Sequence, residues 1–306
     1  MSPIARAGLL AGIGGCVALT AVVALRPAML PTARGSRPAV TLAVASAAQA
    51  KVPAAAVPAA SAAQKGVGAW AFRGSYPALV KSGVRWYYTW GPDHRGIGSP
   101  HGVAFVPMIW GAGSVTTAAL REVRREGRYL LGFNEPDNAG QANMSVAQAL
   151  QLWPRLMSTG MRLGSPAVAS GAATKGGWLD QFMHGVAVHH DRVNFIAVHW
   201  YGGDFATRAA VGQLRAYLLA IHNRYHRPLW LTEFALIRFG ATTVFPSPGQ
   251  QAAFVTAATS MLRSLSYVQR YAWFALPASS GDGTAGLFKP GAIATTAGRA
   301  FERVRP

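Results

Sequence analysis

The chain has 306 residues, of which 51% are hydrophobic, and a formal net charge of +18. This length allows one large hydrophobic core, and the positive charge favours anionic neighbours such as acidic polymers or membrane surfaces. The scattered arginines form no nucleic-acid-binding motif, the single Cys16 excludes a disulfide in the body, and no Cys/His metal spacing occurs, so we expect no nucleic-acid partner, metal or organic cofactor.

Residues 1–30 are predicted to be a targeting segment. Arg6 is followed by an uncharged, mostly apolar run from residue 8 to residue 25. This run is long for a signal peptide and just long enough for a membrane helix, so a cleaved signal and an uncleaved anchor are both open. In either case we expect a secreted or extracytoplasmic protein, which residues 8–25 could tether to a membrane.

Residues 31–64 are rich in alanine, proline and serine and show no periodicity, which is typical of a linker. Such a tether suggests a monomer. Five of the 29 Lys and Arg residues and none of the 11 acidic residues precede Lys65. The predicted catalytic domain, residues 65–306, therefore keeps 24 basic and 11 acidic residues, a net charge of +13.

From Lys65 onward, short apolar runs alternate with segments typical of helices. Eight strands are predicted, at residues 67–70, 84–90, 104–110, 129–135, 162–167, 193–201, 228–234 and 270–276. Predicted helices between them include residues 114–127, 145–159, 207–225 and 248–265. Ser114 and Ser145 are expected N-caps, and Gly127 and Gly160 are expected C-terminal stops.

Near-continuous apolar strands separated by helices indicate a parallel sheet covered on both faces. Eight of them in about 240 residues suit a (β/α)8 TIM barrel, for which about 250 residues is typical. A doubly wound sheet is the alternative, but no Gly-x-Gly-x-x-Gly follows the first strand and no P-loop occurs. The Pro, Gly and His content of residues 91–102 argues against a helix there. We predict an α/β fold, a reduced barrel whose second and third strands have an irregular connection.

Two of the five glutamates end strand-like runs, Glu135 on the fourth predicted strand and Glu233 on the seventh. A carboxylate at the end of a buried strand costs desolvation energy unless it is paired or used. Barrel active sites lie at the C-terminal ends of the strands, so both should reach one mouth, where a glycosidase needs an acid and a nucleophile. A salt bridge to an arginine is the alternative for either one alone. Asp137 is expected to serve a turn or a helix cap.

Aromatic side chains at strand ends could bind the apolar faces of sugars, with ordinary packing as the alternative. The candidates are Tyr88, Trp90, Trp110, Trp273 and Trp178, the last of which could instead anchor a helix start. Trp230 alternates with Glu233 and is expected to face the helix layer. His199 and Tyr201 share parity, so both should point into the barrel, either to serve the site or as a buried pair.

Residues 132–137 (GFNEPD), 197–202 (AVHWYG) and 231–234 (LTEF) resemble glycoside hydrolase family 128, whose studied members are mainly endo-β-1,3-glucanases. The resemblance runs from about residue 66 to residue 302. It implies that Glu135 is the acid/base and Glu233 the nucleophile. It also implies that Asn134 binds the sugar 2-hydroxyl and that Tyr201 holds the nucleophile, and it includes His199 among the candidates.

The sequence therefore predicts a retaining β-glucanase that cuts β-1,3-glucan internally. Retention requires carboxyl groups about 5–5.5 Å apart, against about 6.5–9.5 Å for inversion, and we expect the short distance. Glu135 should be protonated while Glu233 is ionised. The alternatives are a non-catalytic carbohydrate-binding protein on the same fold and a cell-envelope protein held to acidic polymers.

Overall fold

The computed structural model of the chain describes residues 63–278 and 284–305. The predicted targeting segment and the predicted linker up to residue 62 lie outside these residues. The first strand, β1 (Gln64–Gly68), begins at the residue where the predicted linker ends. Among the helices described, none is both long enough and apolar enough to span a bilayer.

Eight parallel strands follow one another around the fold. They are β1, β2 (Trp86–Tyr88), β3 (Ala104–Phe105), β4 (Tyr129–Leu130), β5 (Arg162–Leu163), β6 (Ile196–Gly202), β7 (Leu229–Leu236) and β8 (Val268–Trp273). Six form one sheet in the order β3-β2-β1-β8-β7-β6, and β4 pairs with β5. The continuous sheet is open on both sides of this pair, where single parallel bridges join Met108 to Leu131 and Gly164 to Phe195. The predicted α/β fold with parallel strands is confirmed.

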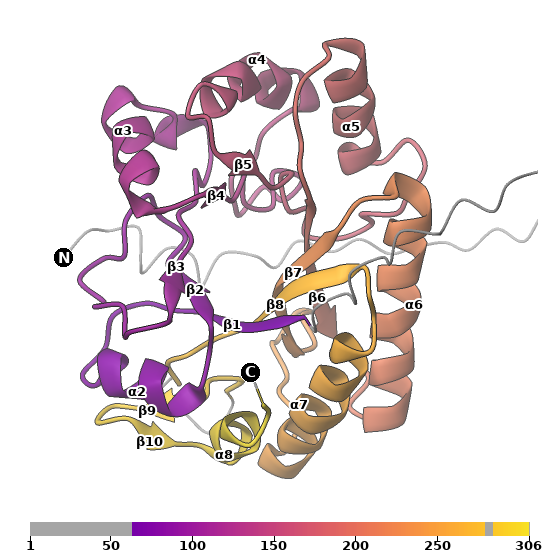
Figure 1. The fold of residues 1–306 in the computed structure, drawn as a ribbon. Coiled ribbons are helices and arrows are strands. Elements are labelled where there is room, and N and C mark those ends of the chain that lie inside the picture. The colour runs from indigo at the N-terminus through magenta and orange to yellow at the C-terminus, as the bar shows by residue number, and fades with distance from the viewer. Residues whose placement is uncertain (1–62, 279–283, 306) are drawn as a thin grey trace, which may run out of the picture. The chain divides into compact units, whose positions relative to one another are not determined.

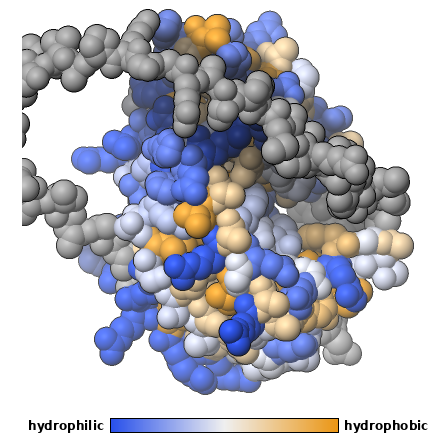
Figure 2. All heavy atoms as spheres, turned by 90° about the vertical axis from the view of Figure 1, so that its right-hand side faces the viewer, coloured by the Kyte–Doolittle hydropathy of each residue, from blue (hydrophilic) through white to orange (hydrophobic). Residues whose placement is uncertain are grey.

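Helices surround these strands in chain order (Figure 1). They are α2 (Ser75–Ser82), α3 (Thr117–Glu126), α4 (Val146–Met157), α5 (Trp178–Val188), α6 (Thr207–Tyr225), α7 (Pro248–Arg263) and α8 (Thr296–Glu302). Residues 89–103, between β2 and β3, contain no helix, as predicted. Figure 2 shows the face on which α6 lies, where hydrophobic residues form separate spots among hydrophilic ones. This pattern fits helices that turn one side to the strands and the other to solvent.

Two local features differ from the sequence predictions. Ser114 ends a short 3₁₀ helix, η1 (Ala112–Ser114), and Thr116 caps α3 instead by accepting a hydrogen bond from the backbone of Ala119. Ser145 caps α4 and Gly127 ends α3 as predicted. The antiparallel hairpin of β9 (Phe288–Lys289) and β10 (Ile293–Ala294), between β8 and α8, was not predicted, because each strand has only two residues.

A second, smaller core fills the inside of the barrel. Its buried members are Trp86, Tyr88, Val106, Met108, Leu131, Phe195, Trp230 and Ala272. Trp230 stacks on Phe195 with ring centroids 4.0 Å apart, so the prediction that it faces the helix layer is wrong. The pairing of β6 with β7 explains this: Val198 lies opposite Leu231 and His199 opposite Glu233, which leaves Thr232 as an extra residue. This bulge resets the alternation, and both Trp230 and Glu233 point inward.

Lys65 ties the first strand to the last helix. Its Nζ donates hydrogen bonds to the carbonyl oxygens of Phe301, at 2.6 Å, and Val304, at 2.8 Å. Burial lowers the pKa of Lys65 to about 7, although the charge of Glu302 acts in the opposite direction. The two carbonyl groups satisfy the amine in this buried position.

We expect the free energy of unfolding to rise with pH between about 7 and 10.5. In this range the unfolded chain binds a proton at Lys65 that the folded chain does not, so the penalty for burying an ammonium group is full below about pH 7 and disappears above pH 10.5. The slope should be on the order of 1 kcal/mol per pH unit. Urea unfolding at three pH values measures it, with Lys65→Met as the variant that should lose the slope. Equal slopes in the two proteins would contradict this account.

Candidate functional site

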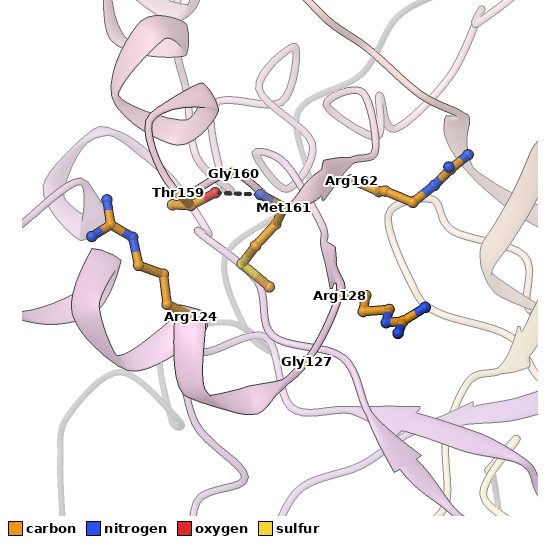
Figure 3. A pocket seen from close by; sticks show the side chains of 7 residues that line it. All are labelled: Arg124, Gly127, Arg128, Thr159, Gly160, Met161 and Arg162. Carbon is orange, nitrogen blue, oxygen red and sulfur yellow. Dashed lines mark hydrogen bonds between the residues drawn. The ribbon is translucent and has the colours of Figure 1, made fainter.

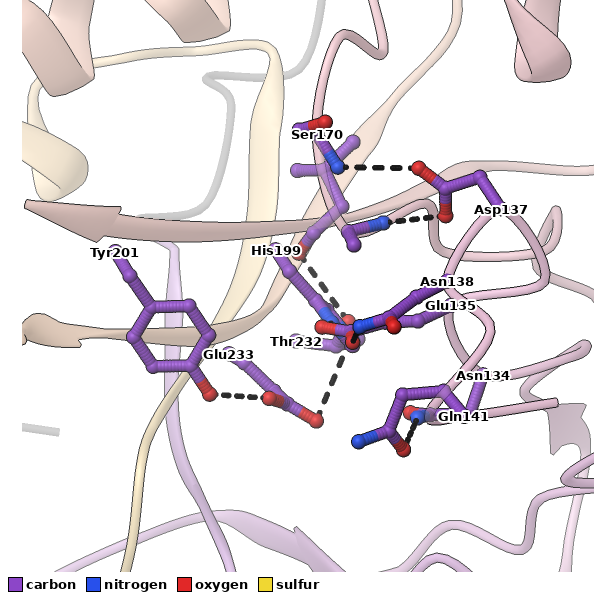
Figure 4. Close-up of polar contacts among 12 residues, drawn as sticks. Asn134, Glu135, Asp137, Asn138, Gln141, Ser170, His199, Tyr201, Thr232 and Glu233 are labelled. Atoms are coloured by element: carbon purple, nitrogen blue, oxygen red, sulfur yellow. Dashed lines mark hydrogen bonds and ion pairs between the residues drawn. The ribbon is translucent and has the colours of Figure 1, made fainter. Parts of the chain in front are cut away.

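The two predicted carboxylates meet at the C-terminal ends of the strands, on either side of His199. Glu135 follows β4, Glu233 lies on β7 and His199 lies on β6 (Figure 4). Nδ1 of His199 is 2.9 Å from Oε1 of Glu135, and its Nε2 is 3.5 Å from Oε1 of Glu233. One ligand atom from each of the three side chains lies within 4.8 Å of the other two. The structure thus brings together side chains that are about a hundred residues apart in the sequence.

Three aromatic side chains donate hydrogen bonds to the buried carboxylate of Glu233. The Tyr201 hydroxyl donates to Oε2, and Trp90 Nε1 donates to Oε1 at 2.7 Å. The Tyr88 hydroxyl lies 3.1 Å from Oε1 and 3.0 Å from the carbonyl oxygen of Thr232. Burial and the charge of Glu233 raise the pKa of Tyr201 well above its usual value, so this hydroxyl keeps the proton that it donates. These donors stabilise and orient an ionised Glu233.

The loop after β4 holds Glu135 in a backbone conformation that non-glycine residues rarely adopt. Its φ is +43°, and its backbone N–H donates to the carbonyl oxygen of Ala167 at 2.7 Å. Asn138 Nδ2 donates to Oε2 of Glu135 at 3.1 Å. Asp137 does not reach the carboxyl group but accepts a hydrogen bond from the backbone of Ala169 at 2.7 Å, which ties this loop to the one after β5. Strained residues of this kind persist where surrounding contacts hold them, often at functional sites.

Asn134 lies beside Glu135 and is almost fully buried. Its Nδ2 donates to Oε1 of Gln141 at 3.2 Å. Its Oδ1 is buried and has no hydrogen-bond partner among the residues that the structure describes. A buried acceptor without a partner is unusual and suits a site that receives a donor from a ligand.

The three ionisable groups at the centre of the site set one another's pKa values. Burial raises the pKa of Glu135, but the hydrogen bond and charge of His199 and the amide of Asn138 outweigh it, so the net direction is down. Burial raises the pKa of Glu233, and the charge of Glu135 adds to this, against the opposing effect of His199. Burial lowers the pKa of His199, but the two carboxylates outweigh it, so the net direction is up. The protonation states of the three side chains therefore depend on one another.

The same three side chains offer a geometry that could hold a cation. Both oxygens of Glu233, however, already accept hydrogen bonds from the aromatic donors described above. This environment satisfies the carboxylate without a metal.

Three aromatic residues that sequence analysis did not select surround this centre. Trp70 follows β1, Phe239 follows β7 and Phe274 follows β8. Trp70 and Phe239 are exposed, and Phe274 is half-buried. The ring of Phe274 lies 5.5 Å from that of Tyr201 and 5.8 Å from that of Trp90. Trp70 closes the predicted first strand and Phe274 directly follows Trp273, so position at a strand end was the signal that could have identified them.

Two of the residues predicted to contact a sugar are fully buried. Trp273 is fully buried and packs on Phe234, with its Nε1 donating to the carbonyl oxygen of Ala285 at 2.7 Å, so its ring has no face free for a sugar. This corrects the prediction for Trp273. Tyr88 is also fully buried and holds Glu233 rather than lining an open cleft.

Trp178 and Trp110 are half-buried. Trp178 is the first residue of α5, stacks on Phe182 and donates from Nε1 to the carbonyl oxygen of Met144 at 2.8 Å. These contacts fit the alternative prediction, an anchor for the helix start. Trp110 packs against the core inside the barrel, and its carbonyl oxygen accepts a hydrogen bond from the backbone N–H of Asn134 at 2.8 Å, so its predicted contact with a sugar stays a prediction.

Comparison with known proteins identifies relatives of this chain. The family model described as glycosyl hydrolase catalytic core matches residues 70–301. A GH128 subgroup I endo-β-1,3-glucanase from Amycolatopsis mediterranei, solved with laminaritriose, is 55% identical with a TM-score of 0.75, and the match covers 78% of this chain and 98% of that one. A GH128 subgroup II endo-β-1,3-glucanase from Sorangium cellulosum is 28% identical with a TM-score of 0.65 and the same coverage.

A further relative is a much longer protein. The Alkali-sensitive linkage protein 1 of Schizosaccharomyces pombe is 32% identical over 212 residues, which make up 67% of this chain. The match spans 37% of the length of that relative.

We expect the loss of one aromatic donor to raise the pKa of Glu233. Tyr201→Phe should raise it, since the ionised carboxylate loses a hydrogen bond that stabilises its charge. Carbon NMR titration of selectively labelled glutamate can follow this carboxyl group, because the chain has only five glutamates.

Tyr217→Phe is the matched control, because it removes a buried tyrosine hydroxyl that is not among the donors to Glu233. It should leave the titration of Glu233 unchanged. An unchanged titration in Tyr201→Phe would contradict the assigned hydrogen bond.

Proposed function

Since the chain belongs to the glycosyl hydrolase catalytic core family and is a glycoside hydrolase, we propose that it cleaves β-1,3-glucan internally with retention of configuration. The observation that carries this proposal is the cluster of Glu135, His199 and Glu233 at the mouth of the barrel. The substrate class is supported by the endo-β-1,3-glucanase from Amycolatopsis mediterranei, of which several structures contain laminari-oligosaccharides.

The distance between the carboxyl groups supports retention. An oxygen of Glu135 lies within 4.8 Å of an oxygen of Glu233. Inverting enzymes keep their carboxyl groups about 6.5–9.5 Å apart to leave room for a water molecule, whereas retaining enzymes hold them about 5–5.5 Å apart. The short separation leaves room for a sugar carbon attacked directly by a carboxylate.

In the proposed reaction, Glu233 attacks the anomeric carbon as Glu135 gives its proton to the departing glycosidic oxygen. This forms a glycosyl ester on Glu233 and breaks the glycosidic bond. Glu135 then removes a proton from water, which attacks the same carbon and frees Glu233. Tyr201, Trp90 and Tyr88 hold the nucleophile in place during both steps.

His199 can supply the protonation state that the first step needs. Its Nδ1 is 2.9 Å from Oε1 of Glu135, which is hydrogen-bond distance, so a proton on Nδ1 can pass to this carboxylate. A bound sugar excludes water from the mouth, which strengthens the burial that raises the pKa of Glu135. Transfer of this proton would leave a neutral imidazole, a protonated Glu135 and an ionised Glu233.

The sugar would contact groups around these carboxylates. The unpaired Oδ1 of Asn134 is available to accept a hydrogen bond from a sugar hydroxyl. Phe239 and Phe274 offer aromatic faces near Tyr201, and Trp70 lies beside Phe274. From the sequence we also propose a monomer that acts outside the cytoplasm, either secreted or tethered to a membrane through residues 8–25.

Glu233→Gln should reduce the hydrolysis of laminarin at least about a thousandfold, because glutamine keeps the shape of the side chain but cannot form the ester intermediate. Reducing-sugar release and product chromatography on laminarin, mixed-linkage β-glucan and mannan measure activity and linkage preference. Glu122→Gln, at a partly exposed surface ion pair with Arg125, is the control and should keep wild-type activity. Binding of laminarin without any cleavage by the wild type would favour a carbohydrate-binding protein instead.

The stereochemistry of the first product is a separate test. Proton NMR of a fresh digest of a β-1,3-linked oligosaccharide should show the β-anomer first, with the α-anomer appearing later by mutarotation. Initial formation of the α-anomer would rule out the covalent role of Glu233 and indicate inversion.

A further inference from the structure

Exposed arginines gather at the end of the barrel opposite the site. Five connections from a helix to the next strand each carry one: Arg85 before β2, Arg128 before β4, Arg162 at the start of β5, Arg192 before β6 and Arg227 before β7. Because the strands are parallel, their N-terminal ends share one end of the barrel, and the C-terminal ends that carry the site form the other.

Acidic residues show the reverse distribution. Six of the ten described acidic residues lie at or beyond the C-terminal ends of the strands: Asp93, Glu135, Asp137, Asp180, Asp204 and Glu233. At the arginine-bearing end lie Glu126, Asp191 and Glu302, each next to the end of a helix. At the N-terminal end of the barrel, the exposed arginines of these five connections therefore outnumber the acidic residues.

Two pockets open at this end, and basic side chains line both. The first, of about 370 Å³, lies between α3, β4 and β5, with Arg124 on one side and Arg128 and Arg162 on the other (Figure 3). The second, of about 310 Å³, is lined by His222, His226 and Arg227 among others. Each pocket is large enough for a small anionic group.

Some of the arginines at this end hydrogen-bond within the fold, whereas others do not. Arg124 donates to the carbonyl oxygen of Ser158, the C-cap of α4, at 2.7 Å, and Arg227 donates to that of Val193 at 2.8 Å. Arg85, Arg128 and Arg162, in contrast, form no side-chain hydrogen bond or ion pair within the part of the chain that the structure describes. Their guanidinium groups are exposed and able to bind an external anion.

We propose that this arginine-lined end of the barrel binds a phosphate-bearing anionic polymer. Guanidinium groups recognise phosphate through paired N–H donors, and Arg128 and Arg162 extend to the same side of the first pocket (Figure 3). The exposed large hydrophobic residues nearest to these connections are Val80 and Val188, near the ends of α2 and α5, and two isolated valines favour a polymer over insertion into a lipid surface. Binding at this end would leave the sugar site at the opposite end open.

The experiment measures binding of the full-length protein to fluorescently labelled long-chain inorganic polyphosphate by anisotropy at 150 mM salt. Arg128→Gln combined with Arg162→Gln should raise the Kd at least about tenfold. The control, Arg208→Gln combined with Arg215→Gln on the exposed surface of α6, removes the same charge and should change the Kd less than twofold. Both variants should hydrolyse laminarin like the wild type, which shows that they are folded.

Several results would overturn the proposal. Equal loss of binding in the two double variants would mean that only net charge matters. Competition of laminarihexaose with polyphosphate would place the polymer at the sugar site. Binding to vesicles of anionic phospholipid without binding to polyphosphate would identify a membrane surface as the partner.

Discussion

The contact of His199 with both Glu135 and Glu233 is the constraint on which the site depends. Its Nδ1 lies 2.9 Å from Glu135 and its Nε2 lies 3.5 Å from Glu233, so a positive charge on the ring offsets part of the repulsion between the two carboxylates. Two buried carboxylates this close could not both stay ionised without such a partner. The same ring also controls the protonation of Glu135, since its hydrogen bond and its charge lower the pKa of that group.

Strands β6 and β7 bring His199 and Glu233 together, and a bulge in β7 turns Glu233 toward the inside of the barrel. The extra residue at Thr232 turns Glu233 inward on the same side as Trp230, where the hydroxyl of Tyr88 and the indole of Trp90 reach it. Without this bulge, regular alternation would place one of the two side chains in the helix layer. The aromatic core inside the barrel thus supports the nucleophile from below, and the loops above remain free to shape the substrate site.

The sequence was informative where a rule acts over short distances. Apolar runs located the strands, and because active sites in such barrels lie at the C-terminal ends of the strands, Glu135 and Glu233 could be assigned to one mouth from the strand count alone. It failed where a single residue changes the alternation or where packing is long-range. Trp273 was predicted to contact a sugar, but it is buried, and the next residue, Phe274, is the partly exposed one. The hydrogen bonds of Tyr88 and Trp90 to Glu233 join residues more than 140 positions apart in the sequence.

The central claim is that Glu233 becomes covalently attached to the sugar, and a trapped intermediate tests it most directly. A 2-deoxy-2-fluoro laminaribiosyl fluoride with the β configuration should form a slowly hydrolysed ester, because fluorine destabilises both transition states while fluoride leaves readily. Intact mass spectrometry should show one added disaccharide, and peptide mapping should locate it on Glu233. An adduct on another residue, or turnover of this reagent with no adduct, would contradict the account.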